Sequence, residues 1–152
     1  MQIVRAYPRH LSLAVPLFDQ YRQFHNQPLD GEGARQFLTE RLSNGDSVIF
    51  LALDGSGSRE AGIGFLQLYP LFSSTQMRPA WLLADLFVVP SARRQGIGRA
   101  LVERAHHLAL ETRACQLILQ TGAGNTAGPA LCERLGYVRD TESLLYVLPI
   151  AK

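Results

Sequence analysis

The chain has 152 residues, 47% of them apolar, which suits a single domain over residues 1–152 with a sizeable core. Its formal net charge of +2 is too small to indicate a nucleic-acid partner bound through bulk charge. No apolar run reaches the length of a signal-peptide core or a membrane span, so the sequence predicts a cytoplasmic protein without a membrane partner.

Metal, lysine and serine-nucleophile chemistry are disfavoured by the residues present. Cys115 and Cys132 are too few for a disulfide scaffold or a zinc site, and the histidines lack metal-ligand spacing. Lys152 is the only lysine, which disfavours a Schiff base and a P-loop lysine. The motifs HExxH, GxSxG and CxxC are absent. We therefore expect no metal cofactor.

In chain order, the first half of the sequence predicts strands and helices from its apolar periodicity and turn residues. Apolar spacing predicts helices, β-branched and apolar runs predict strands, and "DGSGS" predicts a hairpin turn. The expected elements are a strand over 3–7, helices over 9–24 and 32–42, and strands over 47–53, 61–72 and 80–89.

The second half continues with a helix over 97–110, a strand over 115–121 and a short helix over 129–135 that begins after Asn125. Gly136 ends that helix, and "YVRD" and "SLLYVLP" predict two closing strands. The resulting order, β-α-α-β-β-β-α-β-α-β-β, predicts an α/β domain with a mixed (α+β) sheet and helices on both faces.

The stretch "PSARRQGIGRALVERA" joins an apolar strand to a helix through two glycines and several arginines. The first amides of a helix have no internal partner, and the helix dipole makes this end attractive to anions. Glycine allows close backbone approach, and guanidinium groups pair well with phosphate. The pattern therefore predicts a phosphate site, although a glycine-rich helix start with surface arginines remains the alternative.

Two common phosphate motifs do not fit this stretch. A Walker loop needs a Gly-Lys-Ser/Thr ending, and the dinucleotide fingerprint needs a third glycine where this chain has Leu101. Instead, "DLFVVPSARRQGIGRALVERA" resembles the acetyl-CoA-binding motif of the GNAT N-acetyltransferases, Q/R-x-x-G-x-G/A. Downstream, "NTAGPALCERLGYV" resembles the asparagine-containing segment of that family, which ends in L-G-F/Y.

The resemblance implies the GNAT acyl-CoA N-acyltransferase fold over essentially the whole chain. Within the family, the L-x-D-x-F-V strand is similar to that of the spermidine/spermine-type small-amine acetyltransferases. The resemblance also implies acetyl-CoA as the cofactor, bound along the strand before the glycine turn, at the turn itself and in the asparagine segment. The residues so implied are Leu86, Phe87, Val88, Arg93, Arg94, Gln95, Gly96, Ile97, Gly98, Arg99, Asn125, Gly128 and Leu131.

Acetyl transfer to an amine needs a base and a donor to the oxyanion. Asp85 is the one ionisable group in an otherwise apolar strand, so it is either at a cleft or paired with an arginine. Some family members place a glutamate one residue earlier, where this chain has Ala84. We therefore assign the base to Asp85, acting through a water. The backbone N–H of Val88 is the candidate oxyanion donor.

The general acid is less defined by the sequence. The family often has a tyrosine where this chain has Cys132, and a thiol is a weak donor with an ordinary pKa of about 8.5. Packing as a small apolar side chain is the favoured role for Cys132. The acid is then Tyr137, Tyr146 or water, or no dedicated acid is needed, because a thiolate can leave unprotonated.

Candidate residues for the acceptor site lie near the end of the first helix and on the third strand. Aromatic and acidic groups there suit a cationic substrate, although packing in the core or on the surface is the alternative for each. The candidates are Tyr21, His25, Tyr69 and Asp85, with Phe24, Asp30 and Glu32 nearby in sequence.

The sequence predicts an enzyme that transfers the acetyl group of acetyl-CoA to a primary amine of a small molecule by direct attack in a ternary complex. One alternative is a peptide or protein N-acetyltransferase. Another is an acyl-CoA-binding sensor domain without catalysis, because the family's glutamate and tyrosine are missing. Edge strands near the C-terminus further predict a homodimer.

Overall fold

The computed structural model describes residues 1–122 and 127–151. These fall into two compact units, Met1–Gln120 and Thr121–Lys152, each of which is described by itself. The expectation of a single domain stays a prediction. Among the described residues, no helix combines the length and apolar character that crossing a membrane would require.

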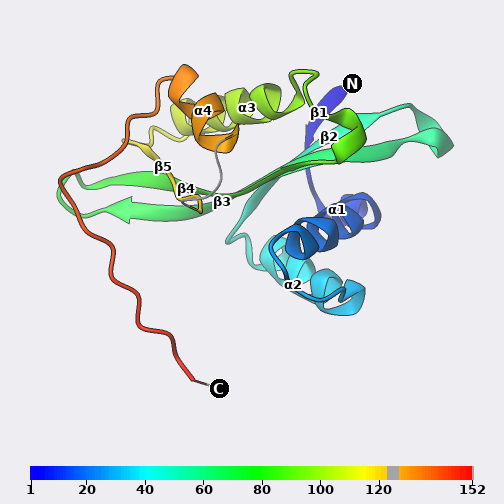
Figure 1. The fold of residues 1–152 in the computed structure, drawn as a ribbon, viewed down its shortest axis with the longest axis horizontal. Helices are drawn as coiled ribbons and strands as arrows, with labels where there is room; N and C mark the ends of the chain where they lie inside the picture. The colour runs from blue at the N-terminus through cyan, green and yellow to red at the C-terminus, as the bar shows by residue number, and fades with distance from the viewer. Residues whose placement is uncertain (123–126, 152) are drawn as a thin grey trace. The chain divides into compact units, whose positions relative to one another are not determined.

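The first unit contains all the strands that the structure describes (Figure 1). Its element order confirms the order predicted for this part of the chain, with shifts of one to two residues at most ends. The elements are β1 (Gln2–Arg5), α1 (Leu11–Phe24), α2 (Gly31–Asn44), β2 (Val48–Asp54), β3 (Ala61–Ser73), β4 (Arg78–Val88), α3 (Ile97–Glu111) and β5 (Leu117–Leu119).

The five strands form one mixed sheet in the order β1-β2-β3-β4-β5. The first three pairings are antiparallel, whereas β5 pairs with β4 in parallel, from Trp81 opposite Leu117 to Leu83 opposite Leu119. A parallel pair needs a crossover connection, and α3 provides it. The predicted mixed sheet is therefore confirmed.

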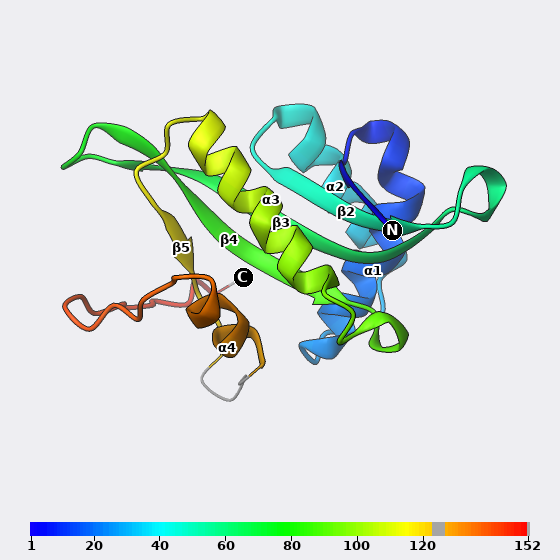
Figure 2. The ribbon, with the colours of Figure 1, turned by 90° about the horizontal axis from the view of Figure 1, so that it is seen from above.

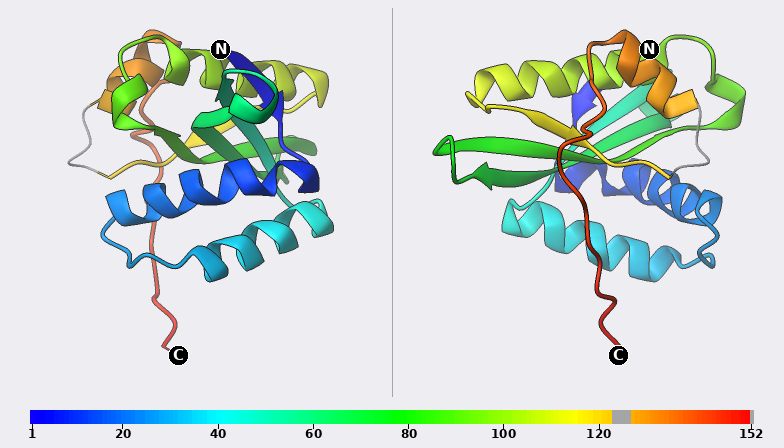
Figure 3. Two further views of the ribbon diagram at one scale, coloured as in Figure 1. Left: turned by 90° about the vertical axis from the view of Figure 1, so that its right-hand side faces the viewer. Right: turned by 60° about the vertical axis from the view of Figure 1, so that its left-hand side comes forward.

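Helices cover both faces of this sheet, as predicted. The helices α1 and α2 lie side by side on one face, and α3 lies on the other, over β3 and β4 (Figures 2 and 3). The buried stripe of α3 is the predicted one and consists of Ile97, Leu101, Val102, Ala105 and Leu108. On the opposite face, Leu51, Phe65 and Phe87 belong to the core that α1 and α2 complete.

An irregularity in β4 positions the side chains that matter most for the site. Along β3, Gln67 lies opposite Asp85, but the next residue, Leu68, lies opposite Leu83. Ala84 is therefore the extra residue of a β-bulge. Because directly opposed residues share a face of the sheet, Gln67 and Asp85 lie on the same face, two positions along from the opposed Phe65 and Phe87.

The second unit contains α4 (Ala127–Arg134), with Pro129 in its first turn and Gly136, at a φ of 99°, just after its end, as predicted. The two closing strands predicted over 137–140 and 143–149 are wrong, because the described residues 135–151 form no strand. A strand needs a neighbour for its backbone N–H and C=O groups, and the pairings in the described chain do not extend past Leu119. Apolar side chains of this segment are 72–85% exposed: Leu144, Leu145, Tyr146, Val147, Leu148 and Ile150.

Candidate active site

The turn between β4 and α3 has the backbone conformation that the glycine pattern indicated. A short 3-10 helix, Pro90–Ala92, follows β4, and Gly96 then caps α3 with φ 81° and ψ 8°. Arg94 is also left-handed, with a φ of 62°. Glycine adopts this region without steric cost, so Gly96 allows the chain to turn directly into the helix.

The first turn of α3 presents backbone amides to its surroundings. The first intrahelical hydrogen bond runs from the N–H of Ala100 to the carbonyl of Gly96, at 3.0 Å. The N–H groups of the three preceding residues, from Ile97 to Arg99, therefore lie ahead of the helical hydrogen-bond ladder. Together with the helix dipole they form a site suited to a phosphate anion.

The arginines of this turn differ in what they contact. Arg93 donates from Nε to the carbonyl oxygen of Val88 at 2.8 Å, and Arg99 pairs with Glu103 at 2.8 Å on the exposed face of α3. Arg94 is exposed and forms no ion pair with the other described residues. Two of the three predicted phosphate-binding guanidinium groups thus have partners within the chain.

Arg93 lies against aromatic rings and not only beside a carbonyl. Its guanidinium carbon lies 5.6 Å from the ring centre of Phe24 and 5.7 Å from that of Phe87. Phe24, Phe87 and Arg93 line an open groove of about 400 Å³, together with Gln20, Gln23 and Pro90. The first arginine of the motif therefore helps to form the wall of this groove.

The backbone of Val88 is directed away from β3. Its neighbour Val89 donates to the carbonyl of Ile63 at 3.0 Å, and alternate residues of an antiparallel strand direct their N–H groups to opposite sides. On the other side of β4, the pairing with β5 ends at Leu83. The Val88 N–H therefore points past the end of the β4–β5 pairing, where it can serve as a donor.

Asp85 is partly buried, and it is hydrogen-bonded on two sides. It accepts a bond from Gln67 Nε2 at 2.6 Å and another from the Tyr21 hydroxyl of α1. Burial raises the pKa of Asp85 above its usual range, while these two bonds and the field of His25 act in the opposite direction. The structure therefore does not pair this carboxylate with an arginine.

Gln67 connects Asp85 to a third polar side chain inside the sheet. Ser47, just before β2, donates from Oγ to Gln67 Oε1 at 2.7 Å. Gln67 has 0% of its surface exposed and Ser47 has 6%, which makes them two of the few buried polar residues of the described chain. The result is a continuous polar chain from Ser47 through Gln67 and Asp85 to Tyr21.

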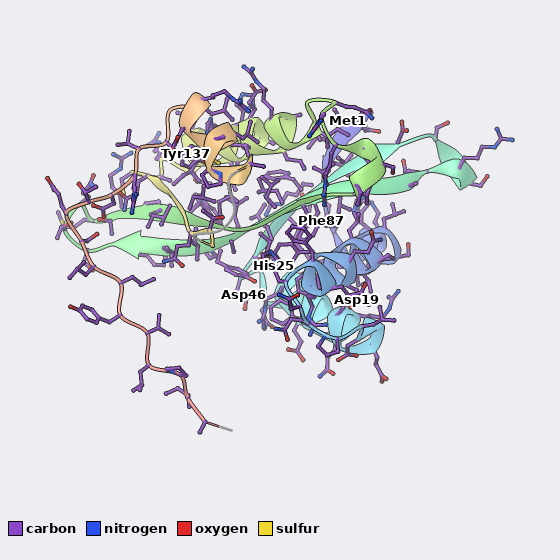
Figure 4. All side chains as sticks on the ribbon, in the orientation of Figure 1. Met1, Asp19, His25, Asp46, Phe87 and Tyr137 are labelled. Carbon is purple, nitrogen blue, oxygen red and sulfur yellow. The ribbon has the colours of Figure 1, made fainter. Side chains whose placement is uncertain are left out.

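Aromatic side chains surround the Asp85 end of this chain. The Tyr21 ring packs edge-on against His25 at 4.6 Å, and against Phe65 and Phe87 at 5.5 and 6.3 Å. His25, at the end of α1, and Phe87, on β4, lie on the same side of the sheet (Figure 4). Burial first, and the negative charge of Asp85 second, raise the pKa of Tyr21 well above its usual range.

Tyr69 joins the same cluster from β3. Burial first and the charge of Asp85 second raise the pKa of its hydroxyl to about 12, while Arg41 acts in the opposite direction. Arg41 itself pairs with Asp46 at 2.9 Å, at the turn between α2 and β2. The structure thus brings together all four residues expected at the acceptor site, namely Tyr21, His25, Tyr69 and Asp85.

Other candidates have different roles. Asp30 caps α2 by accepting from the Gly33 N–H at 2.9 Å, and Glu32 is exposed in the first turn of the same helix. Among the residues that the structure describes, no group of three or more His, Cys, Asp or Glu side chains is arranged to hold a metal ion.

In the second unit, Cys132 is buried on α4, and burial raises the pKa of its thiol. Burial also raises the pKa of the Tyr137 hydroxyl, and the nearby Cys132 adds to this effect. Gly128 and Leu131 lie on α4, Tyr146 is 85% exposed, and Asn125 is outside the described residues. The roles assigned to these residues stay predictions.

Gln67 and Ser47 were not predicted as site residues from the sequence. Gln67 stands in "GFLQLYPLF", and it is as isolated among apolar neighbours as Asp85 is in "AWLLADLFVV". A polar side chain isolated in an apolar strand is the signal that indicates Gln67, and it is the same signal that indicates Asp85.

Comparison with known proteins agrees with this geometry. The family model described as "Acetyltransferase (GNAT) domain" matches residues 45–139. An uncharacterized N-acetyltransferase of Bacillus subtilis, YhfO, is 41% identical over 150 residues, which are 99% of this chain and 98% of YhfO. The match thus extends well beyond the glycine turn.

Solved structures give the same result for the fold. A crystal structure described as "a probable acetyltransferase" superposes with a TM-score of 0.93 at 39% identity, and it covers 100% of this chain and 99% of its own. The aminoglycoside N-acetyltransferase AAC(6')-Iy in complex with CoA superposes with a TM-score of 0.78, over 98% of this chain and 95% of its own. At 20% identity, this second likeness concerns the fold alone.

Proposed function

This chain belongs to the GNAT family of acetyltransferases, and we propose that it transfers the acetyl group of acetyl-CoA to a primary amine of a small molecule. Membership in the family makes it an acyltransferase. The observation that carries the proposal is the part-buried Asp85 carboxylate, held by Gln67 and Tyr21 and three residues before Val88 on β4. A proton acceptor and an oxyanion donor are thus on the same strand.

The turn before α3 fits the diphosphate of acetyl-CoA. A Cβ built on Gly96 would meet nothing within 4 Å, so the backbone at the helix N-terminus can be approached closely. The amides from Arg94 to Arg99 would hold the diphosphate, and Arg94 can add its charge. Leu86, Phe87 and Val88 would line the pantetheine arm along β4, and Asn125, Gly128 and Leu131 stay predictions for the same arm.

In this proposal, Asp85 is the general base that accepts the proton of the substrate ammonium. The substrate ammonium gives its proton to the Asp85 carboxylate, directly or through a water, and the free amine then attacks the thioester carbonyl in a ternary complex. The Val88 N–H donates a hydrogen bond to the oxyanion, and donors of this kind contribute roughly 3–4 kcal/mol. After attack, the nitrogen gives its second proton to solvent. Collapse then forms the amide, breaks the C–S bond and releases CoA as the thiolate, which takes a proton.

The proton that the CoA thiolate takes up has no single assigned donor. The raised pKa values of Cys132 and Tyr137 keep both groups protonated at neutral pH, so each has a proton that it could donate to the CoA thiolate. A thiolate is nevertheless a tolerable leaving group. We therefore assign Cys132 a packing role and expect the reaction to proceed without it, with Tyr137 or water as the donor.

The acceptor we propose is a small cationic amine. Tyr21, Tyr69 and the groove-lining Phe24 supply aromatic surface for an ammonium group, and Asp85 supplies the negative charge. The similarity of the β4 strand to that of spermidine/spermine-type enzymes supports a polyamine-like acceptor within this class. A peptide N-terminus is the alternative acceptor, and acyl-CoA sensing without turnover is the alternative function.

One experiment separates these alternatives. Thiol release from acetyl-CoA would be followed against a panel of polyamines, other small amines and peptides, with Asp85→Asn as the test variant. Asp54→Asn, an exposed carboxylate at the far end of β2, is the matched control. We expect turnover with a small amine, lost by at least about 100-fold in Asp85→Asn and kept in the control. Turnover with peptides alone, or CoA binding with no turnover, would overturn the proposal.

We also propose that the protein is a homodimer located in the cytoplasm. The predicted edge strands are not formed, but the exposed apolar side chains of residues 144–150 offer a surface that a second copy can cover. Light scattering of wild type and of the double variant Leu145→Asp, Val147→Asp tests the oligomer. We expect a dimeric mass for the wild type and a monomeric one for the variant, and a monomeric wild type would refute the idea.

A further inference from the structure

We propose that Gln67 is a positioning residue for the reaction, held by Ser47 so that its amide N–H fixes one oxygen of the Asp85 carboxylate. This inference rests on the proposed function, in which Asp85 accepts the substrate proton. Neither Gln67 nor Ser47 belongs to the glycine turn or to the asparagine segment on which the family resemblance depends.

The orientation of the Gln67 amide is fixed at both ends. Ser47 donates to Oε1 at 2.7 Å, so Nε2 is the end that faces Asp85, whose Oδ2 it reaches at 2.6 Å. A reversed amide would present an oxygen to the carboxylate and nitrogen to Ser47. The pair therefore delivers a donor, and only a donor, to Oδ2.

The setting of Gln67 argues against a purely structural role. Its neighbours on β3, Leu66 and Leu68, are apolar and fully buried, as is usual at such positions. An isolated buried amide is costly, and two apolar side chains of similar shape would pack here at no such cost. What an amide adds is a hydrogen bond that favours the ionised form of Asp85.

The hydrogen bond from Gln67 and the burial of Asp85 have opposite effects on the pKa of Asp85. Burial raises the pKa of Asp85, and the Gln67 bond is the largest influence that lowers it. The other groups that face this carboxylate are Tyr21 and His25 from α1 and Tyr69 from β3. Beyond Tyr69 lies the ion pair between Arg41 of α2 and Asp46 of the turn that follows α2. Removing Gln67 leaves all of these in place.

The test compares the pH dependence of kcat/KM for the wild type, Gln67→Met and Ser47→Ala. Methionine keeps the length of the side chain but has no donor. We expect Gln67→Met to lower kcat by about 10-fold or more at neutral pH and to move the acidic limb of the profile to higher pH. Ser47→Ala should move that limb in the same direction by less. The KM for acetyl-CoA should not change in either variant.

Thr112→Val is the matched control. It removes the hydrogen bond that Trp81 Nε1 donates to Thr112 Oγ1 at 2.9 Å, which also involves β4 but does not reach Asp85. We expect the control to keep the wild-type acidic limb. The inference would be overturned if Gln67→Met or Ser47→Ala kept both the wild-type kcat and the wild-type acidic limb of kcat/KM. If Gln67→Met does not fold, the result for Ser47→Ala decides.

The same set of variants separates this inference from the proposed function. If Asp85→Asn is fully active, Asp85 is not the base and the proposed function itself has failed. If Asp85→Asn is inactive but Gln67→Met has a normal profile, only the inference about Gln67 has failed. Adding Gln67→Met to Asp85→Asn should cause no further loss of activity, because Gln67 acts through Asp85.

Discussion

Replacing Gly96 by alanine tests whether the left-handed turn before α3 serves the donor substrate. Its φ of 81° disfavours a residue with a Cβ by about 1–2 kcal/mol, although the Cβ itself would meet nothing within 4 Å. For a chain of this size, that cost corresponds to roughly 2–8 °C in Tm. To relieve the strain, the backbone must rotate the amides that precede Ala100 away from their present direction.

The loss of binding is expected to exceed the loss of stability. Hydrogen bonds to a charged group contribute about 1.5–3 kcal/mol each, so misdirecting one amide weakens CoA binding by roughly 10- to 100-fold. Isothermal titration with CoA gives the Kd, and calorimetric unfolding gives the Tm. Gly57→Ala is the control, because Gly57 also has a positive φ, 58°, and open space around it, but lies in the loop between β2 and β3.

We expect Gly57→Ala to lower the Tm by a similar amount while its Kd for CoA stays at the wild-type value. The role proposed for Gly96 is refuted if Gly96→Ala and Gly57→Ala lower the Tm by the same amount and both keep the wild-type Kd for CoA. In that case the glycine would serve only to begin the helix, and the phosphate site would have to lie elsewhere.

Three further predictions concern individual side chains. Because burial raises the folded-state pKa of Asp85, its charged form costs stability above that pKa, so Asp85→Asn should raise the Tm at pH 8. The gain should shrink as the pH falls through the folded-state pKa, and a constant gain in calorimetric scans would contradict this. Tyr21→Phe keeps the ring contacts but removes a donor to Asp85, so the acidic limb of kcat/KM should move to higher pH. Cys132→Ala should keep kcat within about 10-fold of wild type, whereas a 100-fold drop in steady-state assays would identify the thiol as the acid.

The parts of the fold with a clear hydrophobic period were predictable from the sequence. The apolar stripe of α3 and the apolar run of β4 each indicate which residues are buried. The turn between them is predicted by its glycines, because their backbone preferences are local. The segment over 143–149 has the same apolar character as a strand but forms none. Whether such a run becomes a strand depends on a neighbour with free backbone groups, and that information is not local.

The site was predictable to the extent that its residues are chemically conspicuous. Asp85 and Tyr21 were found because a carboxylate in an apolar strand and an aromatic residue at a helix end suggest a cationic substrate. The roles of Arg93 and Gln67 were not found, because each depends on a contact between distant segments. Arg93 turns back onto Phe24 of α1, and Gln67 meets Asp85 only through the register of two strands.

The bulge at Ala84 determines on which face of the sheet the Asp85 carboxylate lies. Leu83 lies opposite Leu68, and Asp85 lies opposite Gln67, which is adjacent to Leu68 on β3. Adjacent residues of β3 face opposite sides of the sheet, so Leu83 and Asp85 also face opposite sides, although they are only two positions apart. In a regular strand, Asp85 would share the face of Leu83. The extra residue thus turns Asp85 toward α1, where Tyr21 and Gln67 can hold it.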